Sequence, residues 1–118
     1  MRINTIKMLK EKDLAEMLNC SQRTIKRYTE KQKLIAVDFC NSVRYPGEVY
    51  ADIEIVEKEY LTISEASRYL NICRQKLNEM LDGVYEGDTF FHCKQKVNNK
   101  TKINTRQLLA YINQNIIN

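Results

Sequence analysis

The chain has 118 residues, of which 43% are hydrophobic, so it can bury one ordinary core or two very small ones. It contains only 3 glycines and 1 proline, and no segment is dominated by one residue type or one charge sign, which excludes long disordered tails. The net charge of +4 permits a polyanionic partner, but only the placement of the charges can indicate one.

The composition also bears on the compartment and on bound groups. No run of about 18 apolar residues is present and the N-terminus lacks an apolar signal segment, so we expect a cytoplasmic protein without a membrane partner. In a reducing compartment, Cys20, Cys40, Cys73 and Cys93 are expected to be small buried thiols rather than disulfides. They form no C-x-x-C pair and His92 is the only histidine, so neither a metal site nor a cofactor is predicted.

The sequence contains an internal repeat. A shift of 52 residues aligns 8–19 with 60–71, and apolar positions such as Leu9 and Leu61 largely coincide. This pattern favours a duplicated unit over chance similarity between two amphipathic helix pairs. The predicted units are residues 1–58 and 59–118.

The first unit begins with a predicted helix pair. Leu14, Met17 and Leu18 recur at the three- and four-residue spacing of one helical face. The pattern stops after Leu18, and Ser21 is a typical N-cap for a second helix, expected from Gln22 to about Lys31.

The second helix of this pair has two contrasting faces. Ile25 and Tyr28 are expected to face inward, which leaves the polar face to solvent or to a polyanion. The outward side chains are Gln22, Arg23, Lys26 and Arg27.

A hairpin and a further helix are predicted next. β-Branched and aromatic residues indicate strands at 35–40 and 43–45, joined by a turn at 41–42. The following helix is expected at 47–57.

The second unit repeats this order of elements. Ser64 is expected to cap a helix that ends at Leu70, and a second helix is expected from Cys73 to Leu81. Gly83 is expected to end that helix, because glycine readily adopts the left-handed conformation common at this position. The candidate outward side chains of the second helix are Arg74, Gln75, Lys76, Asn78 and Glu79.

The second hairpin is predicted to be longer and more basic. Strands are expected at 89–93 and 100–103 with a basic tip at 94–99, and a last helix is expected from 105 to about 115. The predicted fold class is α+β, mainly α, with a helix pair, a β-hairpin wing and a following helix in each unit.

With these elements, the chain resembles two families of winged helix-turn-helix proteins. Residues 14–18, 21–28, 33–35 and 43–45 resemble the MerR family, whereas residues 61–70 and 102–111 are similar to the excisionase family. The resemblance implies that the second helix of each pair enters the major groove of DNA, and that the wing contacts the minor groove or phosphates. A second unit stands where a MerR regulator has a dimerisation helix and an effector domain, so no small-molecule effector is expected.

The candidate DNA-binding residues follow from these placements. Arginine and glutamine on a recognition helix can bond guanine and adenine edges, whereas the lysines are expected to hold phosphates. The resemblance adds the wing-strand residues Arg44 and Tyr45. The predicted set is Ser21, Gln22, Arg23, Thr24, Lys26, Arg27, Arg44, Tyr45, Arg74, Gln75, Lys76, Lys94, Lys96, Lys100 and Lys102.

The predicted function is sequence-specific binding of double-stranded DNA by an excisionase-like architectural factor or a transcription regulator of a mobile element or phage. A site-specific recombinase and further copies of the chain are candidate partners. No enzyme is expected, because there is no Gly-rich phosphate loop and only His92 titrates near neutral pH. The alternatives are a protein-interaction module and a single-strand-binding module that would stack bases on Tyr45, Tyr50 and Tyr85.

Overall fold

The computed structural model describes residues 2–51, 53 and 55–117. Short helices and strands alternate along the chain, which confirms the predicted α+β class. The first half contains β1 (Met8–Leu9), α1 (Glu11–Met17), α2 (Gln22–Glu30), β2 (Ala36–Phe39), β3 (Ser42–Pro46) and α3 (Gly47–Tyr50). The second half contains β4 (Tyr60–Leu61), α4 (Ile63–Leu70), α5 (Arg74–Leu81), the 3-10 helix η1 (Phe90–Cys93), β5 (Lys94–Val97), β6 (Lys100–Asn104), α6 (Thr105–Gln114) and β7 (Ile116–Ile117).

The first helix pair forms as the sequence predicts, but its buried face differs. The Ser21 hydroxyl accepts a hydrogen bond from the backbone N–H of Thr24 at 3.2 Å and caps α2. The core side of α1 is formed by Leu14, whereas Met17 and Leu18 are 46% and 45% exposed because α1 ends there. Tyr28, predicted to face inward, is 40% exposed and lies beside the Lys33 ammonium.

The second helix pair begins at a different cap from the one predicted. Thr62, not Ser64, caps α4: its hydroxyl accepts from the N–H of Glu65 at 3.0 Å, and the Glu65 carboxylate accepts from the N–H of Thr62 at 3.1 Å. The helix ends at Asn71 in the left-handed conformation, with φ 57°. Gly83, with φ +73°, follows the end of α5 as expected.

The hairpins lie close to the predicted positions, with two corrections. Both turns use left-handed residues, Cys40–Asn41 in the first hairpin and Asn98–Asn99 in the second, as a two-residue hairpin loop requires. The expected strand at 89–93 is instead a 3-10 helix, because Phe90 and Cys93 stand three residues apart and bury the same side of one turn. The expected tip at 94–99 is strand β5 and its turn.

The predicted helix at 47–57 is shorter than expected. It ends at Tyr50, because Ala51 is extended, with φ −148° and ψ 161°. The Tyr50 hydroxyl donates to the carbonyl of Ile35 and accepts from its N–H, which fixes the helix against the residue that leads into β2. Positions 52 and 54 of this predicted helix lie outside the described residues.

The internal repeat extends to the strand register. β3 pairs with β1 and β2, and β6 pairs in the same way with β4 and β5. Val37 faces Arg44 in the first hairpin, and Gln95 faces Lys102 in the second, each 58 positions later. The offset is 52 through the helix pairs, so the segment between α5 and β5, which contains η1, is longer than the loop between α2 and β2.

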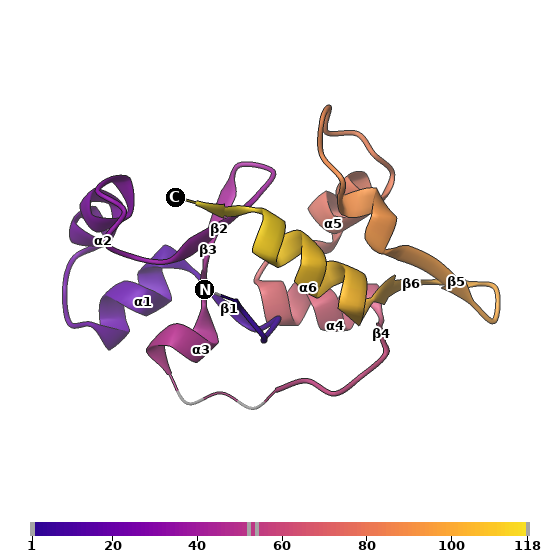
Figure 1. Ribbon diagram of the computed structural model, residues 1–118, viewed down its shortest axis with the longest axis horizontal. Helices are drawn as coiled ribbons and strands as arrows, with labels where there is room; N and C mark the ends of the chain where they lie inside the picture. Colours follow the sequence, from indigo (N-terminus) through magenta and orange to yellow (C-terminus); the bar gives the residue numbers. More distant parts are fainter. Residues whose placement is uncertain (1, 52, 54, 118) are drawn as a thin grey trace.

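The two halves share one core. Phe39 of β2 packs on Tyr111 of α6, with ring centroids 5.8 Å apart, and Ile3 and Ile6 belong to the same buried cluster. The C-terminal strand β7 returns to pair with β2, so the order of the first sheet is β1-β3-β2-β7 (Figure 1). The molecule measures 45 × 32 × 25 Å, with α2 near one end and the β5–β6 hairpin at the other (Figure 1). Within the described residues, no helix combines the length and apolar character needed to cross a membrane.

Candidate nucleic-acid interface

The outer face of α2 is the first part of the candidate interface. Gln22, Arg23, Lys26 and Arg27 are all exposed, as predicted from the helical period. The Lys26 ammonium lies 4.0 Å from the carboxylate of Glu11 on α1, an exposed pair that remains competent to exchange its partner for a phosphate. Ser21 and Thr24, also in the predicted set, lie at the cap of α2, and their hydroxyls are 3.0 Å apart.

The first hairpin does not present its predicted contacts to solvent. Tyr45 is 1% exposed, burial raises its pKa, and its hydroxyl lies 2.8 Å from that of Thr29. Tyr45 is therefore a core residue that cannot touch DNA, and its prediction as a wing contact is wrong.

Arg44 is half-buried and bonded inside the protein. Its Nε and Nη2 donate to the carbonyl of Asn71 at 3.1 and 2.8 Å, and Nη1 donates to the carbonyl of Val43 at 2.8 Å. Burial lowers the pKa of this guanidinium. Arg44 thus joins the first hairpin to the C-terminal end of α4, where the bonded carbonyl would otherwise lack a partner.

On α5 the predicted residues separate into two groups. Arg74 and Gln75 are exposed, whereas Lys76 is half-buried. The Lys76 ammonium donates to the carbonyl of Cys40 at 2.7 Å and to the Ser42 hydroxyl, so it holds the turn of the first hairpin. Only the first two therefore lie on a face that is open to a ligand.

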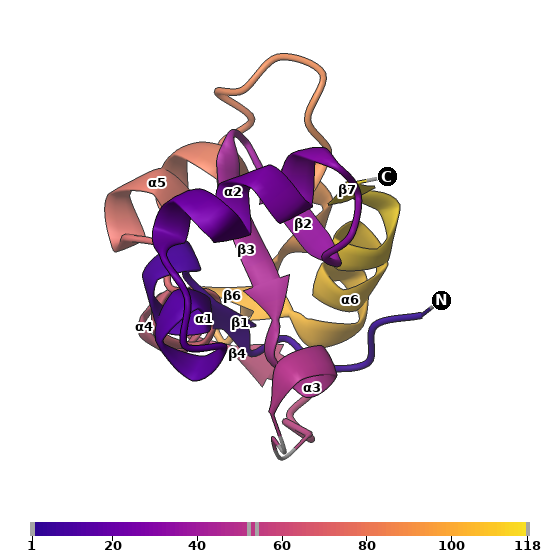
Figure 2. The same cartoon turned by 90° about the vertical axis from the view of Figure 1, so that its left-hand side faces the viewer.

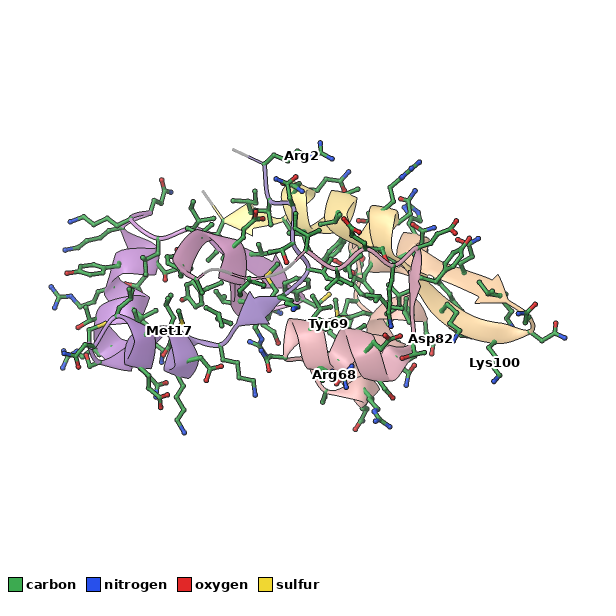
Figure 3. The ribbon with its side chains drawn as sticks, turned by 90° about the horizontal axis from the view of Figure 1, so that it is seen from below. Arg2, Met17, Arg68, Tyr69, Asp82 and Lys100 are labelled. Carbon is green, nitrogen blue, oxygen red and sulfur yellow. The ribbon has the colours of Figure 1, made fainter. Side chains whose placement is uncertain are left out.

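The second hairpin projects from the end of the molecule (Figure 1). Lys94, Lys96 and Lys100 are exposed and Lys102 is half-buried. Lys94 lies 3.6 Å from the carboxylate of Asp82, and in the part of the chain that the structure describes the other three form no ion pair. Figure 3 shows the Lys100 side chain pointing away from the body of the molecule. This hairpin has the free basic surface that the first one lacks.

A hollow of about 530 Å³ lies where α1, α2 and the first hairpin meet. It brings Gln22, Lys26 and Arg44 of the predicted set together, and it adds Lys10 and Lys12. The sequence analysis missed these two lysines because they alternate with the acids of the first turn of α1, and the linear charge pattern therefore cancels.

A second basic feature was also missed. The Arg68 guanidinium lies 5.5 Å from the centroid of the Tyr69 ring, and the Lys7 ammonium lies 5.8 Å from the same centroid. Figure 3 shows Arg68 and Tyr69 on α4, on the side of the molecule away from α6. Only the packing of β1 against α4 brings Lys7 to this ring, so no local pattern in the sequence could indicate it.

The four cysteines are free thiols, but they are not all buried as expected: Cys93 is buried, Cys20 and Cys40 are half-buried, and Cys73 is exposed at the start of α5. Desolvation by burial raises the pKa of Cys40 to about 11 and that of Cys93 to about 12, so both are protonated thiols at neutral pH. Among the described residues, no three His, Cys, Asp or Glu side chains are placed to hold a metal ion. The two other tyrosines considered for base stacking bond within the protein, Tyr50 to Ile35 and Tyr85 to the carboxylate of Glu79.

The exposed basic helix α2 and the basic β5–β6 hairpin are two basic surfaces at opposite ends of the molecule, each suited to a polyanion. Residues 54–81 match the model of the NUMOD1 domain, a small DNA-binding domain of the helix-turn-helix type. The matched segment includes β4, α4 and α5, and therefore the second helix pair. The match supports DNA binding but does not single out the MerR or excisionase families. No curated protein and no solved structure matches the chain.

Proposed function

We propose that this chain is a non-enzymatic, sequence-specific double-stranded-DNA-binding protein with two winged helix-turn-helix units in tandem. The observation that carries most weight is the repeated helix pair and hairpin with identical strand register, together with the NUMOD1 match over the second pair. Helix-turn-helix proteins insert the second helix of the pair into the major groove. Here α2 and α5 hold that position in each unit.

The exposed side chains divide into two roles. Arg23 on α2 and Arg74 on α5 are the candidate base readers, because a guanidinium can bond O6 and N7 of guanine together. The lysines of the β5–β6 hairpin hold phosphates and fix the register of the protein on the duplex. The 45 Å long axis runs from α2 to the β5–β6 hairpin (Figure 1), so one monomer can contact DNA with α2 at one end and with the hairpin lysines at the other.

The biological role that best suits this arrangement is that of an architectural factor or transcription regulator of a mobile element or phage. Two recognition helices in one chain give the geometry that other proteins of this class obtain by dimerising, so a palindromic site is not required. A site-specific recombinase and further copies of the chain along DNA are the proposed partners. No cofactor or small-molecule effector is part of this function.

Selection of bound duplexes from a random pool tests the function directly. We expect a motif to be enriched, with affinity that falls steeply as the salt concentration rises, because bound counterions are released from DNA. Arg23→Ala should cost about 1 to 3 kcal/mol and relax the preference at one base pair. The matched control is Lys31→Ala, an exposed cation at the C-terminal end of α2, which should leave the selected motif unchanged. A pool that yields no motif would contradict the proposed function.

A further inference from the structure

The hollow between α1, α2 and the first hairpin has an uneven balance of charge. Its lining includes four cations, Lys10, Lys12, Lys26 and Arg44, against one acid, Glu11. Figure 2 looks at this end of the molecule and shows α2 crossing in front of the β2–β3 hairpin. The remaining polar lining consists of Gln22 and Asn41, which can supply neutral hydrogen-bond donors, and Ser42, whose hydroxyl is bonded to Lys76.

Two of these cations are already compensated or bonded within the protein. Lys26 lies 4.0 Å from Glu11, and Arg44 donates to the carbonyls of Asn71 and Val43. Lys10 and Lys12 are exposed, and in the described part of the chain neither makes an ion pair. The hollow therefore retains an unbalanced positive charge from these two lysines.

The residues that line the hollow all belong to the first helix pair and the first hairpin. The turn of this hairpin is held by Lys76 of α5 through Cys40 and Ser42, so the hollow lies on the unit that contacts α5. On the proposed function, a duplex that contacts both α2 and α5 passes this hairpin turn, and its backbone carries one negative charge per about 1.7 Å of axis.

We propose that this hollow holds one phosphate of the DNA backbone between the two recognition helices, with Lys10 and Lys12 supplying the charge. This site rests on the proposed function. It also assigns separate roles to the cations, since Lys10 and Lys12 contact DNA whereas Arg44 and Lys76 build the wall behind them.

The test uses the full chain, a duplex carrying the selected motif and a scrambled duplex. The double variant Lys10→Gln/Lys12→Gln should bind both duplexes about three- to tenfold more weakly and lower the salt slope by about one, with the selected motif unchanged. The control variant Lys31→Gln/Lys33→Gln removes two exposed lysines that do not line the hollow and should change neither quantity. Circular dichroism checks that both variants are folded.

Neutral methylphosphonates placed one at a time along the duplex locate the phosphate. One position should weaken binding of the wild-type chain but not of the Lys10/Lys12 double variant. Two outcomes would show that the hollow is not a phosphate site, although the chain binds DNA. In the first, every methylphosphonate position weakens DNA binding by both proteins equally. In the second, the double variant keeps the full salt slope while Arg23→Ala still relaxes the selected motif. Saturable binding of inorganic phosphate that the double variant abolishes, without any change in DNA binding, also overturns the proposal. If the wild-type chain binds neither duplex, the proposed function itself fails.

Discussion

The two halves of this protein share one chain path but use it differently. In the first half the hairpin is enclosed: Tyr45 is buried, and Arg44 is bonded to Asn71. In the second half the positions that match Arg44 and Tyr45 are Lys102, which is half-buried, and Ile103, which is buried. The tip of this hairpin, with the exposed Lys96 and Lys100, projects from the end of the molecule (Figure 1). The comparison teaches that a duplicated unit can become a structural support in one copy while it remains a free surface in the other.

The two proposed recognition helices, α2 and α5, differ in the opposite sense. The side chain of Ser21 caps α2, whereas Cys73 at the start of α5 makes no capping hydrogen bond. The outer face of α2 is open over four polar residues, but α5 gives Lys76 to the first hairpin. We therefore expect α2 to read sequence more stringently than α5, and the second unit to anchor DNA largely through its hairpin.

The largest expected effect concerns whether the halves fold together. Phe39→Ala removes a fully buried ring at the packing of β2 on α6 and should cost about 3 to 5 kcal/mol. Because this core joins both halves, we expect one cooperative unfolding transition in urea at a lower midpoint, followed by far-UV circular dichroism. The control is Phe91→Ala, the same change at a 43% exposed site, with an expected loss within about 0.5 kcal/mol. A biphasic curve that keeps one wild-type midpoint would mean that the halves fold independently.

Arg44→Ala tests whether the first hairpin supports the fold or contacts DNA. It leaves the carbonyl of Asn71 without its charged donor, so we expect about 1 to 3 kcal/mol lower stability. The salt slope of DNA binding should not change, because the guanidinium is bonded inside the protein. Arg44→Lys keeps the charge but not the planar fork, so it should be destabilised as well. A salt slope lower by about one in the alanine variant would show that Arg44 holds a phosphate instead.

Much of the local structure could be predicted from the sequence, because it depends on neighbouring residues. The Ser21 cap, the end of α5 at Gly83 and the start of α6 after Asn104 each follow from a local hydrogen bond or backbone preference. The register of the two hairpins was harder to predict, because it depends on which two residues form each turn. A cysteine followed by an asparagine, as in Cys40–Asn41, is not an obvious sequence signal for a turn of two left-handed residues.

The errors in the candidate site come from tertiary contacts. Arg44 and Tyr45 alternate along β3 as a half-exposed strand would, but both of its faces are covered: Tyr45 packs on α1 and α2 of its own unit, and Arg44 is bonded to Asn71 at the end of α4. Lys10 and Lys12 were not predicted as site residues, because the hollow that brings them together is formed by three separate elements, α1, α2 and the first hairpin. Exposure at a boundary between repeated units is decided by the partner unit, which no local pattern describes.

A smaller effect compares the first helices of the two pairs. Two hydrogen bonds hold the pKa of Glu65 below its ordinary 4.5. The larger effect comes from the Lys58 ammonium and the next from the N–H of Thr62. The stability from Glu65 is therefore present above about pH 4.5 and is lost as the pH falls through the lowered pKa of the folded state. Glu65→Gln keeps an oxygen that can accept from the N–H of Thr62 but removes the charge beside Lys58, so it should lower stability by a few tenths to about 1 kcal/mol at pH 7 and by less near pH 3, measured as thermal midpoints across that range. Asp13 is the corresponding residue of α1, and no ion pair of its carboxylate is found within the described residues, so Asp13→Asn should change stability by only a few tenths of a kcal/mol at either pH. The same pH dependence for the two changes would contradict the role of the Lys58–Glu65 pair.

The smallest expected effect separates the two hairpins at one matched position. Lys100 at the start of β6 corresponds to Ser42 at the start of β3, where Lys76 binds the hydroxyl. Because Lys100 is exposed and makes no ion pair within the described residues, its ammonium is free for a phosphate. Lys100→Gln should weaken binding by less than about 1 kcal/mol on selected and scrambled duplexes alike, and should lower the salt slope by about one. Ser42→Ala should leave the salt slope unchanged, since its hydroxyl faces α5. If Lys100→Gln changes the selected motif, the second hairpin contacts bases. The proposal that α2 recognises the base sequence while this hairpin binds only phosphates would then be wrong.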